Sequence, residues 1–175
     1  MNQETLLAKL PLISGWIDKT LSDHAAQARP VAALGFTRLP QFYSAKLLNG
    51  AKVIPVSKVP TPPLTQMGLP EFLDFENMVP DGITYKDTYF VQETKLTNES
   101  LHFHELVHVV QWDHLGVQGF LLAYAAGLAA HGYMDSPLER MAYALQGHFD
   151  QNGRPADVEA FIRGELSKIN SIPAV

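Results

Sequence analysis

The residues most able to do chemistry lie in one short run, HELVH, which spans His104 to His108. Each residue of an α-helix turns the chain by about 100°, so His104 and His108 lie about 40° apart, one turn along the same face. Two neutral imidazoles placed in this way can bind one metal ion. Glu105 lies about 100° from His104, beside such an ion. The spacing therefore predicts a metal site with Glu105 as a general base that acts on water.

A zinc site of this kind needs a third protein ligand, and Glu139 is the favoured candidate. It lies in GYMDSPLERMAY, in the first turn of a helix that Ser136-Pro137 is expected to begin. Ser136 and Glu139 also have the spacing of a capping box, so a bond from the Glu139 side chain to the helix start is the alternative. Asp135 and His131 are less favoured, because the direction of their helix end or loop is open.

Two further histidines lie near the motif but point away from it on a continuous helix. His114 follows His104 by ten residues, the spacing of the long H-E-x-x-H-x-x-G-x-x-H pattern, but that pattern has glycine where this chain has Gln111. In an unbroken helix His114 points about 80° away from His104, and His102 points about 160° away. Neither is expected to bind the metal. Gln111 shares the face of His104, where a surface role and a contact with the site are equally compatible.

The elements that must position this motif are indicated along the chain. Residues 1–30 have apolar side chains at helical spacing. In 31–59, the runs VAALGF and AKVIPV predict two strands, and the proline-rich segment 59–70 predicts an irregular loop. The run ITYKDTYFV, residues 83–91, alternates as a strand does and is the clearest strand prediction.

The second half of the chain is predicted to be helical. Thr97, Asn98 and Ser100 offer caps for the helix that carries HELVH, and Gly116 ends it. The expected helices span residues 98–115, 117–132, 136–148 and 155–169. The order of a helix, several strands and then helices predicts an α+β domain.

Length and composition fit one globular domain. The chain has 175 residues, of which 46% are hydrophobic and 18% are charged, a balance typical of a packed protein. We therefore expect a single domain over 1–175, with a helical segment at 1–30, a strand-rich part at 31–91 and a helical part at 98–170 that carries the metal site.

Charge and residue usage exclude several classes of function. Thirteen Lys and Arg against eighteen Asp and Glu give a net charge of -5, which disfavours nucleic-acid binding. The chain has no cysteine, so any metal must be held by nitrogen and oxygen. The N-terminus does not match a signal peptide, and the longest apolar stretch, 120–130, is too short to span a bilayer. We expect a cytoplasmic protein with no membrane partner.

The sequence resembles the gluzincin branch of zinc metallopeptidases, in which two histidines of H-E-x-x-H and a glutamate from a following helix bind zinc. HELVHVVQW and SPLERMAY carry the resemblance, which runs from about Ile83 to Tyr143 and is most like small bacterial zincin-like proteins. It implies a zincin-like α+β fold with a short, mostly antiparallel sheet beside the active-site helix. The strand predicted at 83–91 would line the cleft and could pair with an extended peptide substrate.

The resemblance also implies a chemistry, in which His104, His108 and Glu139 hold zinc and Glu105 is the base for peptide hydrolysis. Gluzincins often place an aspartate four residues after the ligand glutamate, where this chain has Tyr143. Tyr143 could donate to an oxyanion, with a core or rim position as the alternative. We therefore expect a zinc-dependent metallopeptidase. One alternative is a catalytically silent zinc-binding domain that binds a partner, and another is a metal-free scaffold.

Overall fold

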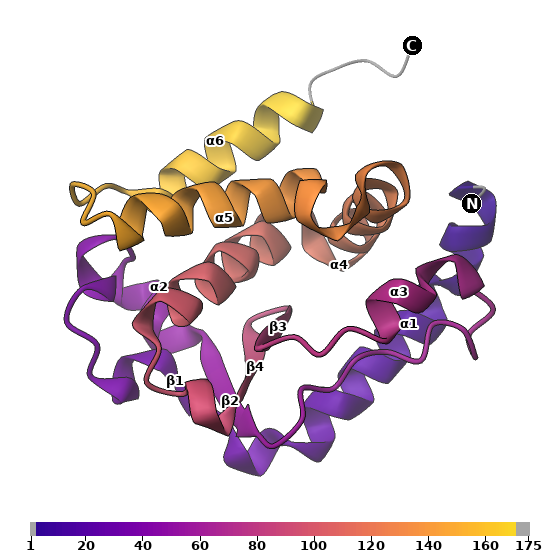
Figure 1. Ribbon diagram of the computed structural model, residues 1–175, viewed down its shortest axis with the longest axis horizontal. Helices are drawn as coiled ribbons and strands as arrows, with labels where there is room; N and C mark the ends of the chain where they lie inside the picture. The colour runs from indigo at the N-terminus through magenta and orange to yellow at the C-terminus, as the bar shows by residue number, and fades with distance from the viewer. Residues whose placement is uncertain (1–2, 171–175) are drawn as a thin grey trace.

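The computed structural model describes residues 3–170, in which helices pack around a small four-stranded sheet (Figure 1). The fold class is α+β, as expected. In Figure 1, α1 runs along the lower side of the molecule, and α4, α5 and α6 lie above the sheet. The helices are α1 (Gln3–Asp23), α2 (Ala45–Gly50), α3 (Leu73–Glu76), α4 (Glu99–Asp135), α5 (Pro137–Asp150) and α6 (Val158–Asn170). The strands are β1 (Arg29–Pro30), β2 (Lys52–Val56), β3 (Gly82–Tyr85) and β4 (Thr88–Gln92).

The sheet is mixed, with the order β1-β2-β4-β3. The pairs β1 with β2 and β3 with β4 are antiparallel, and β2 with β4 is parallel. The single strand predicted at 83–91 is wrong in one respect, because the chain reverses at Lys86, with φ of 60°, to form a hairpin. The turn residues Lys86 and Asp87 put Tyr85 opposite Thr88, so the alternation of side chains shifts by one residue across the turn. Neither turn residue is glycine or asparagine, so the usual hairpin signal is absent.

The prediction for VAALGF is also corrected by the structure. Val31–Leu34 form a short 3-10 helix that ends at Gly35, with φ of 72°, and β1 covers only the two residues before it. Val31 is the only β-branched residue of the run, and its alanines favour helical backbone. AKVIPV forms β2 as predicted, and the proline-rich segment 59–70 is irregular as predicted.

The helix that carries HELVH begins and breaks where the sequence indicates. The Asn98 side chain accepts a hydrogen bond from the Leu101 amide and caps the N-terminus. Within α4 the backbone leaves the helical region at Gly116 (φ 68°, ψ 172°) and at Gly132 (φ 74°, ψ -178°). Both conformations are essentially restricted to glycine. α4 thus consists of three helical pieces separated by two breaks, and α5 follows it.

One helical stretch, 99–150, passes a test of length and mean hydropathy for membrane-spanning helices. A core helix of a soluble protein passes the same test. The stretch here is broken at Gly116 and Gly132, and 17% of its most apolar window is buried inside the molecule. The absence of a membrane partner stays a prediction.

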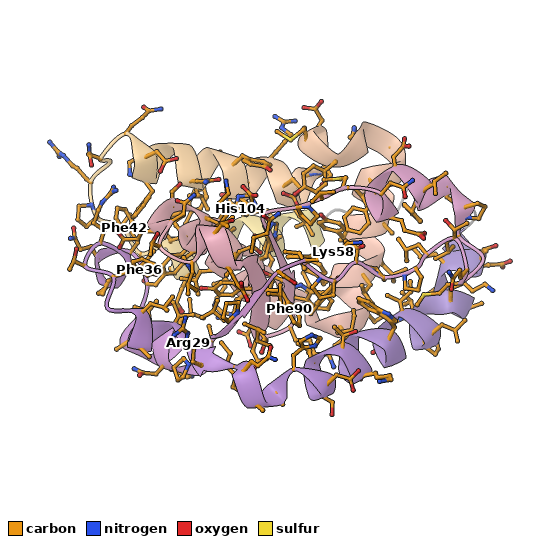
Figure 2. All side chains as sticks on the ribbon, turned by 60° about the horizontal axis from the view of Figure 1, so that its bottom comes forward. Arg29, Phe36, Phe42, Lys58, Phe90 and His104 are labelled. Carbon is orange, nitrogen blue, oxygen red and sulfur yellow. The ribbon has the colours of Figure 1, made fainter. Side chains whose placement is uncertain are left out.

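The first piece of α4 is the centre of the molecule, since every residue from His102 to Trp112 is buried. Figure 2 shows His104 and Phe90 of β4 among the packed side chains. Polar side chains inside a core must find partners there, because an unpaired buried polar group costs several kcal/mol, about 2–7. Five of these buried residues are polar, namely His102, His104, Glu105, His108 and Gln111.

We predict that Gly116→Ala lowers the free energy of unfolding by about 1–3 kcal/mol, because alanine is strained at this φ and ψ. A Cβ at Gly116 would meet nothing within 4 Å, so the loss would come from the backbone alone. Gly119→Ala is the matched control in the same helix, where the new Cβ would make an ordinary 3.5 Å contact with Leu115. The control should be neutral or slightly stabilising. Denaturant titration measures both, and equal losses would contradict the strain argument.

Candidate metal centre

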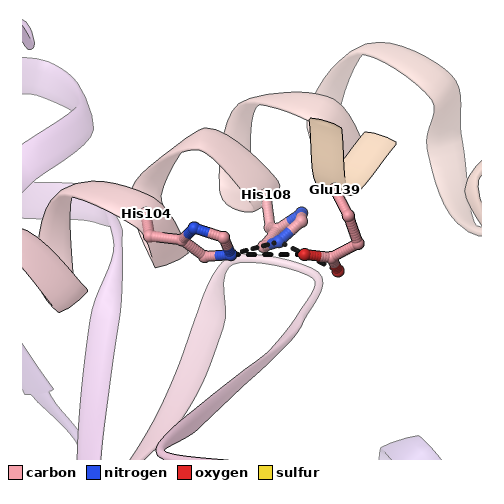
Figure 3. Close-up of side chains that lie close together, drawn as sticks. All are labelled: His104, His108 and Glu139. Carbon is pink, nitrogen blue, oxygen red and sulfur yellow. Dashed lines mark hydrogen bonds and ion pairs between the residues drawn. The ribbon is translucent and has the colours of Figure 1, made fainter. Parts of the chain in front are cut away.

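Three side chains from α4 and α5 converge in the core, as Figure 3 shows. The Nε2 atoms of His104 and His108 lie 3.0 Å apart. Glu139 Oε2 lies 3.4 Å from His104 Nε2, and Glu139 Oε1 lies 3.4 Å from His108 Nε2. A tetrahedral zinc site with bonds of about 2.0–2.1 Å separates its ligand atoms by about 3.3 Å. The separations are close to this value, so the group could hold a metal ion.

The three side chains are almost fully removed from water. Their exposed fractions are 5% for His104, 6% for His108 and 1% for Glu139. Glu139 Oε1 accepts a hydrogen bond from the Tyr124 hydroxyl at 2.7 Å, whereas buried Oε2 has no hydrogen-bond partner within residues 3–170. A carboxylate oxygen without such a partner in a dry core is unfavourable, and a bound cation would compensate it.

Two glutamine amides fix how the imidazoles present their nitrogens. His108 Nδ1 lies 2.8 Å from Gln111 Oε1, and the amide of Gln111 donates to the Leu138 carbonyl at 3.1 Å. His104 Nδ1 lies 3.0 Å from Gln146 Oε1, and the amide of Gln146 donates to Ser100. Each Nδ1–H therefore donates to a glutamine oxygen, which leaves each Nε2 lone pair free for a cation.

Charges within the group depend on one another. Burial works to lower the pKa of His108, but the Glu139 carboxylate beside it raises that pKa to about 9. Burial also works to raise the pKa of Glu139, but His108 and His104 hold it well below its usual range. Without a cation, Glu139 is thus ionised and His108 carries a proton. Metal binding would replace that proton, because only neutral imidazole is a ligand.

Glu105 lies next to the group and is held by β3. Its Oε2 accepts a hydrogen bond from the Thr84 hydroxyl at 2.6 Å. Burial raises the pKa of Glu105, and His104 and His108 act against that shift. A Cβ on Gly82 would lie 2.5 Å from Glu105 Oε1, so only glycine leaves room for the carboxylate here. This strand therefore both orients the carboxylate and makes space for it.

The capping alternative for Glu139 is not formed. Ser136 makes no side-chain cap bond among residues 3–170, and the Glu139 carboxylate faces the histidines. Pro137 occupies the first turn of α5, where no backbone N–H is needed. A Cβ on Gly127 would lie 3.1 Å from Ser136, so this glycine allows the two chain segments to approach closely.

The other candidate ligands lie elsewhere, as the helix geometry predicts for His114 and His102. His114 is partly exposed, and its Nε2 lies 3.4 Å from the Ser167 hydroxyl. His102 is fully buried, with the Tyr89 hydroxyl 2.7 Å from Nδ1 and the Leu96 carbonyl 2.9 Å from Nε2. Burial lowers the pKa of His102 to about 4, so it is a neutral core residue.

The alternative ligands His131 and Asp135 are exposed at the end of α4, outside the group. Tyr143 packs against His104, with ring centroids 4.6 Å apart, and its exposed fraction is 37%. Tyr133, rather than Tyr143, lines the cavity that contains the group. A role for Tyr143 as oxyanion donor stays a prediction.

Several residues of the site were not identified from the sequence. Gln146 follows Glu139 by seven residues, about 20° around the helix, so a helical projection of α5 would have placed them together. Thr84, Gly82 and Tyr124 reach the site from β3 and from the second piece of α4. Only the tertiary fold brings them there, and no local pattern marks them.

Comparisons with protein-family models, with curated proteins and with solved structures found no match for this chain. The resemblance to gluzincins therefore depends on the motif residues, and it stays a prediction.

We predict that Glu139→Ala weakens zinc binding strongly, whereas His114→Ala leaves it nearly unchanged. Glu139 supplies one of the three converging ligand atoms, and His114 lies outside the group. Zinc titration of both variants by calorimetry measures the difference. A defect confined to His114→Ala would show that the ligand set is wrong.

We predict a further effect on zinc affinity from Gln111→Leu, which removes the acceptor for His108 Nδ1 and keeps a similar volume. Loss of a group that hydrogen-bonds a metal-ligating histidine typically lowers metal affinity by about 10–100-fold. Gln118→Leu is the control, because Gln118 is exposed on the same helix. Equal affinities of the two variants would contradict a positioning role for Gln111.

Proposed function

We propose that the protein is a zinc-dependent metallopeptidase that hydrolyses an amide bond with Glu105 as general base. The observation that carries the proposal is the convergence of His104 Nε2 and His108 Nε2, 3.0 Å apart, with the Glu139 carboxylate, of which one oxygen lies 3.4 Å from His104 Nε2 and the other 3.4 Å from His108 Nε2. Two imidazoles and one carboxylate suit zinc among the common metals, and three protein ligands leave a position open.

Each polar side chain has a distinct task in this proposal. When bound, zinc would supply a Lewis acid and lower the pKa of a water molecule. Glu105 would accept the water's proton, and its raised pKa makes it a better acceptor than an exposed glutamate. The same carboxylate would then return the proton to the leaving amine, so that one amide C–N bond breaks and an acid and an amine form.

The support for a base at Glu105 is its orientation. The Thr84 hydroxyl holds Oε2, so the rotation of the carboxylate is restricted. Oε1 lies close to Gly82, where a Cβ would come within 2.5 Å of it. A purely structural zinc site has no need for a second carboxylate held in this manner. This favours the enzyme over the silent zinc-binding domain, which is the second candidate.

We predict that Glu105→Gln retains one zinc per chain and the fold but lowers peptide hydrolysis by about 10²–10⁴-fold, because an amide cannot accept the proton. Glu93→Gln is the control, since Glu93 is exposed and should retain full activity. The measurements are metal analysis and cleavage of a broad peptide library.

The outcomes separate the three candidates. Stoichiometric zinc without cleavage by the unchanged protein would favour the silent zinc-binding domain. A protein purified without chelators that contains no stoichiometric zinc would favour the metal-free scaffold. Equal cleavage by Glu105→Gln and the unchanged protein would remove Glu105 from the mechanism.

A further inference from the structure

The metal group lies at the wall of a cavity whose other walls are almost entirely apolar. Leu6, Ile13 and Ile17 of α1 form one side. Phe120 and Leu128 of α4 form another, and the proline-rich loop and α3 close the remainder. The cavity volume is about 100 Å³. A ligand here would exchange water for hydrocarbon over most of its length, and would meet histidine and carboxylate side chains only at the metal group and the neighbouring Glu105.

The shape of the cavity indicates a chain rather than a bulky group. Leu6 and Ile17 are eleven residues apart in α1, which corresponds to about 16 Å along the helix. Phe120 and Leu128 are separated by about 12 Å along α4 on the same basis. For comparison, a compact engineered cavity of about 150 Å³ binds benzene. The cavity here has a smaller volume, about 100 Å³, although its lining residues extend along two helices, so we infer that it is narrow. A narrow apolar cavity suits an unbranched alkyl chain.

The polar side chains of the lining outside the metal group already have partners. The Thr61 hydroxyl donates to the Glu76 carbonyl at 3.3 Å. The Tyr85 hydroxyl donates to the Pro60 carbonyl at 2.9 Å. A peptide backbone placed along this channel would lose its hydrogen bonds to water and find few replacements, which is costly. An alkyl chain has no such requirement.

The edge of the sheet is also less suited to an extended peptide than the zincin resemblance implies. β3 is an edge strand, and its outward groups would have to pair with a substrate strand. The Thr84 carbonyl, however, accepts a hydrogen bond from the Trp112 indole at 3.1 Å. In an antiparallel pair the N–H and C=O of one residue point to the same side. The outward side of β3 at Thr84 therefore faces α4.

We propose that this cavity binds an unbranched aliphatic acyl chain whose carbonyl end lies at His104, His108 and Glu139. The substrate class is then an amide that joins an aliphatic acyl group to an amine or a peptide. The assignment rests on the proposed hydrolysis, and it specifies the acyl side of the bond. Water adds to the carbonyl carbon, the C–N bond breaks, and a fatty acid and an amine are released.

The test measures binding of three amides that differ only in chain length: N-methylacetamide, N-methylhexanamide and N-methyldecanamide. Calorimetry uses the zinc-loaded Glu105→Gln protein, so that no amide is consumed. We expect affinity to rise by about fourfold per methylene that enters the cavity, the gain for burying one CH₂. N-acetylphenylalanine N-methylamide is the peptide probe, and tighter binding of that probe than of N-methyldecanamide would overturn the assignment.

A matched pair of variants locates the binding. Ala125 lines the cavity and is half-buried, whereas Ala126 is exposed beside it and lies outside the lining. Ala125→Leu should lower the affinity for N-methyldecanamide by at least about tenfold, since its added methyl and methylene groups occupy the space of the chain. Ala126→Leu should bind as the parent does. Equal affinities of the two variants would overturn the assignment.

Failure of this inference and failure of the proposed function give different results. Alkyl binding depends on apolar contact, so its dependence on chain length should persist after zinc is removed with a chelator. Retention of zinc and of peptide cleavage, with no dependence on chain length, would overturn the acyl assignment alone. Loss of zinc stoichiometry with chain-length dependence intact would overturn the metallopeptidase, and with it the amide substrate, but not the binding of an alkyl chain in the cavity.

Discussion

The structure depends on one buried carboxylate, Glu139, held between two imidazoles. Taking an ionised carboxylate out of water is costly unless charge and hydrogen bonds surround it, and removal of one partner from such a group typically costs about 3–5 kcal/mol. His108 supplies the charge, His104 lies in contact with the other oxygen, and the Tyr124 hydroxyl supplies a hydrogen bond. The position of Glu139 therefore constrains α4 and α5 together.

This constraint explains why the chain doubles back where it does. Glu139 follows His108 by thirty-one residues, and an uninterrupted helix would carry it far from the histidines. The breaks at Gly116 and Gly132 reverse the direction, and the absence of a side chain at Gly127 lets the α5 start approach α4. Gly116 and Gly132 are thus required by their backbone conformation, and Gly127 is required by the close approach of Ser136. All three help to place the Glu139 carboxylate.

The sequence predicted the parts that depend on local pattern. HELVH on a capped helix, its end at Gly116 and the helix start at Pro137 follow from spacing and cap chemistry, and the structure contains all of them. It could not decide whether Glu139 bonds to its own helix start or faces the histidines, because both readings use the same spacing. The hairpin at Lys86 was not predicted because its two-residue turn contains neither glycine nor asparagine, the residues that usually indicate such a turn.

The apolar cavity and the polar group are two aspects of one arrangement. Electrostatic interactions strengthen as water is excluded, so the walls that α1 and the second piece of α4 provide make Glu105 and Glu139 respond more strongly to any nearby positive charge. Burial raises the pKa of Glu105, whereas Glu139 keeps its charge because the histidines are in contact with it. One dry site thus holds two carboxylates of different basicity, and the difference comes from the two imidazoles that contact Glu139 directly, whereas Glu105 is held by the Thr84 hydroxyl.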